Sequence, residues 1–218
     1  MRLAISTKHK FYLAIGEVSM NNLADKVKKS NILEMSIMFS AMIRLFAKGS
    51  KERIVQHLWD MTPVLPVINS ADDYENFHKR FCEWFCREIR TAEKTLKNGK
   101  TIPSQHASYG QAAKVLDVAF KVYIYYCSQP SSDDSARIDP FLHAAMDTAM
   151  MKYLTSKYPE TPVRSTTVEQ VDEQTYSVLK GLVARDIKER FQGEILPVQW
   201  DDIMWRELNR ETEEWEQK

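Results

Sequence analysis

The chain has 218 residues and carries 30 Lys and Arg against 30 Asp and Glu, so its formal net charge is zero. Hydrophobic residues make up 44% and charged residues 28% of the chain, and this composition excludes a disordered or fibrous protein. Zero net charge also excludes an overall field that would attract nucleic acid or a membrane, so any such binding is expected to be local.

Neither a secreted nor a membrane protein is expected. The most apolar stretch, 32–47, is short and contains Glu34 and Arg44, so it is too polar to cross a bilayer. The apolar stretch at residues 1–6 is too short for a signal peptide. An odd number of cysteines is typical of free thiols in a reducing compartment, and we expect a cytoplasmic protein without disulfides; the three are Cys82, Cys86 and Cys127.

Apolar spacings of three and four residues predict helices along most of the chain. They are expected over 31–48, 50–59, 72–97, 112–127 and 140–157, then between a capping box of Thr166 with Glu169 and Gly193, and finally from about Trp200. No set of alternating strands is evident. We therefore predict one all-α domain over 1–218, with six to eight helices around a buried central helix, 112–127, and the last two helices outside or reaching a partner.

The predicted central helix is apolar almost all round but contains Lys114, Asp117 and Lys121 at helical spacing. The next predicted helix would present His143 and Asp147 one turn apart. The five groups are predicted to form either an ion-pair network or a working site in which Asp147 holds His143 as a base. The alternative is that both lysines reach solvent along their aliphatic stems.

The same region resembles a two-helix signature of uncharacterised bacterial all-helical proteins. That signature has a Gly-x-Ala-Gln-Lys start, a second lysine, and then His and Asp four residues apart. The matching residues lie within 109–151 and include Gly110, Lys114 and Lys121 with His143 and Asp147. The chain departs from the signature at Ala113, Asp117 and Ala144-Ala145, and the resemblance implies no activity.

A second resemblance concerns catalysis. Arg137 and His143 have the Arg-x5-His spacing of HEPN-type ribonucleases, which are all-α and cut RNA without a metal. The resemblance implies that His143 would handle the 2′-hydroxyl proton while Arg137 stabilises charge at phosphorus, with Asp147 in support. Pro140 separates Arg137 from the helix expected to hold His143.

No metal site or cofactor is predicted. His78, Cys82 and Cys86 lie four residues apart on one predicted helix, and a single helix cannot surround a metal even if His106 or Cys127 is added. Core packing is the better interpretation of these cysteines. Glycine-rich phosphate loops, His-Glu-x-x-His and Gly-x-Ser-x-Gly motifs are all absent from the sequence.

The two ends of the chain differ in charge. Residues 1–60 contain ten Lys and Arg against five acidic residues, whereas 193–218 contain eight acidic and three basic residues. The acidic end has three tryptophans, which are enriched where proteins bind one another: Trp200, Trp205 and Trp215. Local basic clusters at 26–29 and 44–53 are either phosphate contacts or ordinary helix-end charges.

These observations predict a non-catalytic accessory subunit of a larger cytoplasmic bacterial assembly, docking through the C-terminal helix. A phage-defence complex acting on nucleic acid would fit, with nucleic acid bound through the partner or a local basic patch. The sequence is also compatible with a homo-oligomer. The alternative function is a HEPN-like ribonuclease that uses Arg137 and His143.

Overall fold

The computed structural model describes residues 20–97, 99–165 and 167–216. Within them the fold is all-α, with one small hairpin of two two-residue strands. The α-helices are α2 (Met20–Ser36), α3 (Ser50–Met61), α4 (Ala71–Glu88), α5 (Tyr109–Phe120), α6 (Ser132–Ile138), α7 (Thr148–Lys157), α8 (Glu173–Phe191) and α9 (Pro197–Glu216). Short 3-10 helices are η1 (Ile37–Phe39), η2 (Ala41–Leu45), η3 (Thr62–Val67), η5 (Asp139–Phe141) and η6 (Val168–Gln170). The strands β1 (Lys94–Thr95) and β2 (Thr101–Ile102) pair antiparallel.

Helix α5 is the centre of the fold, as the sequence predicts. Six of its apolar residues are inaccessible to solvent: Ala112, Ala113, Val115, Leu116, Ala119 and Phe120. Helices α4, α2 and α8 and the turn η6 pack around it. A capping box of Ser108 with Gln111 fixes its first turn. Past Phe120 the helix continues as one π-helical segment, η4 (Lys121–Tyr126), so the predicted helix over 112–127 is confirmed in position but changes type near its end.

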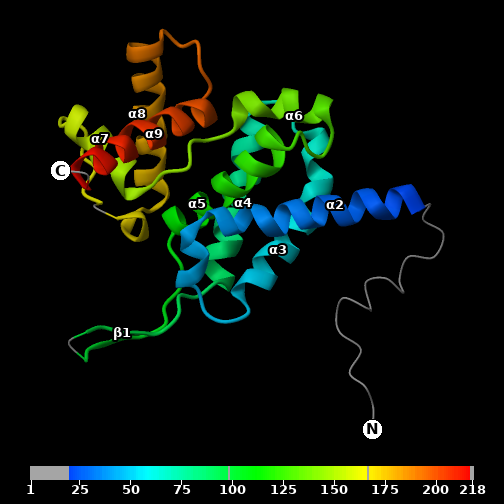
Figure 1. Ribbon diagram of the computed structural model, residues 1–218, viewed down its shortest axis with the longest axis horizontal. Coiled ribbons are helices and arrows are strands. Elements are labelled where there is room, and N and C mark those ends of the chain that lie inside the picture. The colour runs from blue at the N-terminus through cyan, green and yellow to red at the C-terminus, as the bar shows by residue number, and fades with distance from the viewer. Residues whose placement is uncertain (1–19, 98, 166, 217–218) are drawn as a thin grey trace.

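The helices form two groups that meet at α5 (Figure 1). Helices α2 to α6 lie on one side, and α7, α8 and α9 pack against one another on the other side. The hairpin β1–β2 projects away from both groups. Within the described residues, every helix is too short or too polar to cross a lipid bilayer.

Two predicted helices end earlier than expected. The helix predicted over 31–48 falls on α2, which begins at Met20, eleven residues before the predicted start. It ends at Ser36, where the hydroxyl bonds back to the Leu33 carbonyl at 2.8 Å and 3-10 turns follow. The helix predicted over 72–97 ends at Glu88. Residues 89–92 are extended instead, because their backbone groups bond to Leu45, Ala47, Gln105 and Ala107.

The helix predicted over 140–157 is wrong in its first half. Residues 142–147 are not helical, and α7 begins only at Thr148 because the Asp147 side chain caps it by accepting the Met150 amide at 2.9 Å. His143 and Asp147 therefore do not share a helix face.

The next predicted helix is also displaced at its start. Thr166 of the predicted capping box lies outside the described residues, and the observed box pairs Thr167 with Gln170 at η6, whereas Asp172 caps α8. The predicted end at Gly193 is confirmed, since Gln192 and Gly193 both have positive φ after Phe191.

Candidate functional site

Four buried polar side chains meet where the two groups of helices join, and we call them the histidine cluster. Its members are His78, Asp117, His143 and Tyr176. Each comes from a different part of the fold: α4, α5, the extended segment 142–147 and the first turns of α8. A polar group inside a core of this kind is costly unless it has a partner, so its contacts decide what it does.

The Tyr176 hydroxyl contacts all three other members. It donates to Asp117 Oδ2 at 2.7 Å and lies 3.1 Å from His143 Nδ1 and 3.3 Å from His78 Nε2. His78 Nε2 also lies 3.1 Å from Asp117 Oδ1. The His78 and Tyr176 rings stack with centroids 5.3 Å apart, which fixes both groups in position.

A second layer of polar groups orients the two imidazoles. His143 Nε2 lies 3.1 Å from Glu75 Oε1, and Lys180 forms an ion pair with the same carboxylate. The bond from His143 lowers the pKa of Glu75 to about 2, with help from Lys180 and against burial. On the other ring, Cys82 Sγ lies 3.6 Å from His78 Nδ1.

Burial dominates the titration of the cluster itself. It lowers the pKa of His143, against the pull of the Glu75 carboxylate, and it raises the pKa of Tyr176 well above the ordinary value, with Asp117 adding to the effect. Tyr176 therefore keeps its proton at neutral pH.

The five residues predicted to form one polar cluster are divided by the structure. Asp117 faces α4 and α8 and joins His143 through Tyr176. Lys121 instead donates to two carboxylates of α9, at 2.7 Å to Asp201 and 3.0 Å to Asp202. Neither Lys114 nor Lys121 pairs with Asp117. Side chains three or four residues apart on a helix can meet, but here Asp117 bonds to His78 and Tyr176, and Lys121 bonds to the carboxylates of α9.

Lys114 lines a cavity of about 370 Å³ together with Asp147. The other polar residues of its wall are Gln111, Thr148, Thr167 and Glu169. Burial lowers the pKa of Lys114, opposed by the nearby carboxylates of Asp147 and Asp201. The alternative in which a lysine simply reaches solvent does not describe Lys121, which is held in ion pairs, but it is compatible with Lys114, which is partly exposed at the cavity wall.

Arg137 and His143 have separate partners. Arg137 lies on α6 and bonds to the Ile68 carbonyl, to Asn69 Oδ1 at 2.9 Å, and to Asp134. His143 is only 9% exposed, and its nitrogens face Tyr176 and Glu75. A catalytic HEPN histidine must reach the RNA 2′-hydroxyl, so this geometry gives the ribonuclease alternative no support.

The three tryptophans of α9 differ in environment. Trp200 is fully buried, so its predicted place on a docking surface is wrong: its Nε1 donates to Asp186 Oδ2 at 2.7 Å inside the fold. Trp205, on the same helix, is 54% exposed. The Trp215 side chain lies outside the described residues.

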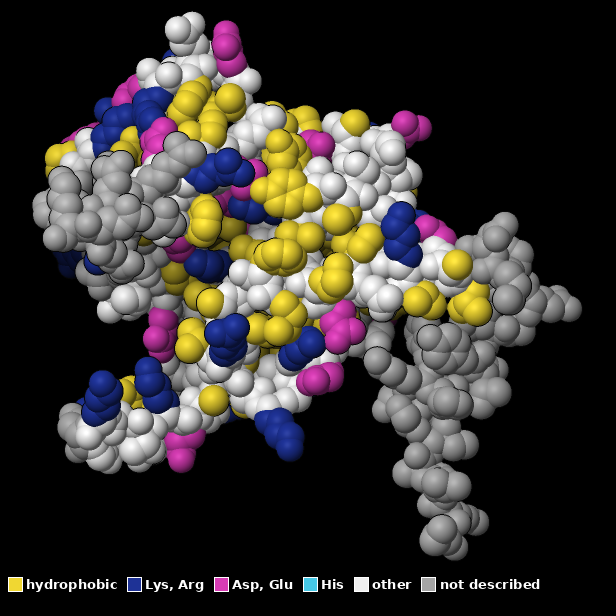
Figure 2. All heavy atoms as spheres, viewed as in Figure 1, with side chains coloured by type: hydrophobic (Ala, Val, Ile, Leu, Met, Phe, Trp, Pro, Cys, Tyr) yellow, Lys and Arg dark blue, Asp and Glu magenta, His cyan; other side chains and the backbone are white. Residues whose placement is uncertain are grey.

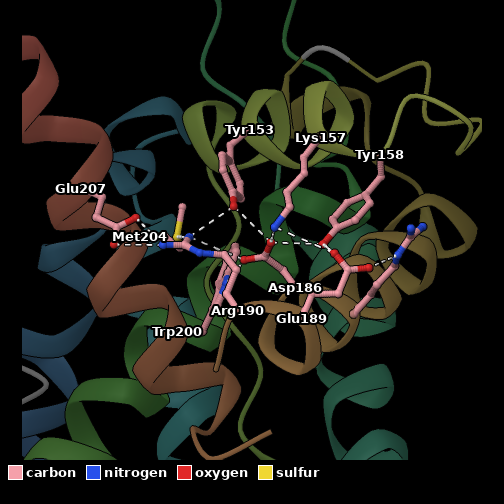
Figure 3. Close-up of polar contacts among 10 residues, drawn as sticks. Tyr153, Lys157, Tyr158, Asp186, Glu189, Arg190, Trp200, Met204 and Glu207 are labelled. Carbon is pink, nitrogen blue, oxygen red and sulfur yellow. Dashed lines mark hydrogen bonds and ion pairs between the residues drawn. The ribbon is translucent and has the colours of Figure 1, made fainter. Parts of the chain in front are cut away.

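Asp186 on α8 is the centre of a separate buried network (Figure 3). Its carboxylate accepts from Lys157 at 2.6 Å, from Trp200, and from the hydroxyls of Tyr153 and Tyr158 at 3.1 Å each. Figure 3 shows these side chains converging on Asp186 of α8 from α7, from Tyr158 directly after it, and from α9. Each of these contacts joins neighbouring helices, so the network stabilises the packing of this group.

The sequence indicated only part of these sites. The sequence shows that His78 and Cys82 lie on one side of a helix, but it does not show their partners. The other residues considered with them are elsewhere: His106 bonds to Arg90, and Cys86 and Cys127 have free thiols. Tyr176 has no sequence signal, because a tyrosine at a core position is normally an apolar filler. Glu75 and Asp186 lie at positions that look solvent-facing in sequence.

No protein-family model, no curated protein and no solved structure matches this chain.

Proposed function

We propose that this protein is a non-catalytic interaction subunit that binds an amphipathic, acidic helix of a partner protein. The observation that carries the proposal is a group of exposed large apolar side chains, which we call the apolar strip: Met35, Met38, Phe39 and Leu45. Exposed side chains of this size commonly mark a binding surface when they are contiguous.

The apolar strip lies where α2 ends and the 3-10 turns begin. Phe39 is 72% exposed and Met35 57% exposed, although both lie within a few residues of the buried Leu33 and Ile37. Figure 2 shows hydrophobic side chains gathered across the middle of this face, around the C-terminal end of α2. Three methionines, counting the half-buried Met42, make such a surface adaptable to a helical ligand.

Basic side chains beside the apolar strip indicate the charge of the partner. Lys28 lines a hollow along α2 together with Met35, and Arg44 precedes Leu45. Lys28, Arg44 and Lys48 form no ion pair with any residue in the described part of the chain, whereas Lys29, Lys51 and Arg53 do. A partner helix with acidic flanks would complement this rim.

The remaining parts of the proposal concern location and assembly. The three free thiols support a reducing compartment such as the cytoplasm. Nucleic acid, as in a phage-defence assembly, would be reached through the partner, since the chain has no net positive charge. Trp205 on the acidic helix α9 offers a second contact of the kind that binds proteins.

Photocrosslinking in the source cells tests the proposal. A photoreactive amino acid at Phe39 should capture one partner protein, and the same probe at Val64, an exposed residue of η3 outside the apolar strip, should not. The captured segment should be an amphipathic helix with acidic flanks. With that partner purified, Phe39→Ser should weaken binding about tenfold or more, and added salt should weaken it further.

Val64→Ser is the matched control, because it removes an exposed apolar side chain elsewhere and should leave the affinity unchanged. Equal capture at both positions, or a captured segment that is basic, would contradict the proposal. Failure of the Phe39 probe to capture any protein would contradict it as well.

A further inference from the structure

The histidine cluster has the composition and the convergence of a metal site. His78, Asp117 and His143 each offer a ligand atom, and these atoms lie within 4.8 Å of one another although the three residues come from separate parts of the chain. The Tyr176 hydroxyl lies among them. We propose that these four side chains bind one divalent transition-metal ion, through two imidazole nitrogens and two oxygens.

The separations of the four atoms suit a small ion. A tetrahedral ion with bonds of about 2.0 Å has ligand atoms about 3.3 Å apart. The observed separations are 3.1 Å between His78 Nε2 and Asp117 Oδ1, and 3.3 Å and 3.1 Å from the Tyr176 oxygen to His78 and His143. Tyr176 and Asp117 Oδ2, which are hydrogen-bonded at 2.7 Å, would have to move apart, and the ligand atoms of His78, Asp117 and His143 all lie within 4.8 Å of one another.

The proton inventory of the cluster leaves one contact without a proton. Tyr176 has a single proton, and the short bond to Asp117 uses it. A neutral His143 has one ring proton, and the position beside Glu75 favours that proton on Nε2, where the carboxylate can accept a hydrogen bond. His143 Nδ1 and the Tyr176 oxygen then present lone pairs to each other at 3.1 Å, and a cation between them would turn this repulsive contact into two bonds.

The buried charge of Asp117 also favours a bound cation. The Asp117 side chain is inaccessible to solvent, and no Lys or Arg among the described residues pairs with it. Its contacts in the cluster are the His78 imidazole, which is a cation only when it is protonated, and the uncharged Tyr176 hydroxyl. A buried carboxylate without a cation is rare because ions are costly to remove from water, and a metal ion would supply the missing charge.

The surroundings match the second layer of known metal sites. Metal-bound histidines usually donate their other ring N–H to a carboxylate, and Glu75, which Lys180 holds in place, lies 3.1 Å from His143 Nε2, where it can accept such a bond. A metal on His78 Nε2 would leave the other proton on Nδ1, directed at Cys82 Sγ. Four protein ligands in a buried site are typical of a structural ion, and two imidazoles with two oxygens favour zinc-like ions over calcium or magnesium.

Metal titration of the full-length protein tests this inference. After chelation and dialysis, the protein should take up one Zn²⁺ or Co²⁺ per chain, and its melting temperature should rise with the concentration of either ion. The Co²⁺ form should show the visible absorption of a four-coordinate ion and no thiolate-to-metal band, because no cysteine is among the ligands. Tyr176→Phe, which keeps the ring and its packing, should weaken binding about tenfold or more.

The variants His78→Gln and Asp117→Asn should lose uptake, with circular dichroism at low temperature showing that each is folded. His106→Gln is the matched control, since this histidine lies outside the cluster against Arg90 and should not affect uptake. A wild-type protein that takes up neither ion and gains no thermal stability would overturn the inference, and so would a thiolate band or equal uptake by the Tyr176→Phe variant. The cluster would then be a purely hydrogen-bonded core network.

Discussion

Lys114 and Lys121 lie two turns apart on the central helical segment, yet the structure predicts opposite effects for their removal. Lys121 forms an ion pair with Asp201, a buried carboxylate that also accepts the Ala145 amide and is repelled by the neighbouring Asp202. Lys121→Met should cost about 3 to 5 kcal/mol of unfolding free energy, because it leaves that charge unpaired. Lys114→Met should be neutral or slightly stabilising, since burial already disfavours its charge. Urea unfolding at pH 7 measures both, and equal losses in the two variants would contradict the prediction.

At this scale the sequence could predict which residues are polar in the core but not which of them meet. The spacing of Lys114, Asp117 and Lys121 correctly placed three charges on one buried helix. Their partners, among them Tyr176 and Asp201, are distant in sequence and carry no local signal. Pairing across helices depends on packing angles and side-chain directions, which the helical period does not determine.

Glycines on α5 and α8 provide a test of packing at the scale of helices. Gly110 lies against η6, and an added Cβ would come within 2.4 Å of the Val168 carbonyl oxygen and 2.6 Å of Val171 Cβ. Gly110→Ala should therefore destabilise the fold by about 2 kcal/mol or more, because a backbone atom would have to move.

Gly181 on α8 is the matched control for that substitution. It is exposed and meets nothing within 4 Å, so Gly181→Ala should stabilise the protein by about 1 kcal/mol through helix propensity. Thermal unfolding of both variants checks the pair of predictions. A stabilised Gly110→Ala variant would show that η6 does not pack on α5 as described.

The elements themselves were predicted best where a helix has a clear apolar face and a cap. Helix α4 has such a face and a Ser70 cap, and its observed start at Ala71 lies one residue from the predicted start at 72, although its end was placed nine residues too late. Helix α2 was misplaced because the apolar residues of the run 32–46 are too closely spaced to mark one helix face, so periodicity cannot show where a helix gives way to 3-10 turns. The segment 142–147 was misassigned as helix for a different reason: Asp147 acts as an N-cap, and a single acidic residue within a helical pattern rarely reveals that role.

In the whole molecule, two polar sites hold the groups of helices in place. The histidine cluster joins α4 and α5 to α8, and the Asp186 network joins α7, α8 and α9 to one another (Figures 1 and 3). The apolar core surrounds both, but polar networks require a particular geometry, whereas apolar contacts tolerate sliding. We therefore expect the packing of α7, α8 and α9 to depend strongly on the Asp186 carboxylate.

The contribution of Asp186 to the free energy of unfolding should vary with pH. Burial raises the pKa of Asp186, but the hydrogen bonds from Lys157, Trp200 and Tyr153 outweigh it and hold the pKa below the ordinary value of 3.8. A carboxyl group with a lowered pKa stabilises the fold above its unfolded pKa, and that stability is lost as the pH falls through the folded value. Asp186→Asn should cost about 3 kcal/mol at pH 7, since an amide cannot accept from all four donors. The difference in unfolding free energy between wild type and variant should stay constant down to about pH 4 and narrow below it.

Glu83→Gln, an exposed change on α4, is the control and should shift the unfolding free energy by less than about 0.5 kcal/mol at pH 7, 5 or 3. Urea unfolding at pH 7, 5 and 3 measures all three proteins, and a gap that widens toward pH 3 would mean that Asp186 is not the ionised acceptor that holds α7, α8 and α9 together.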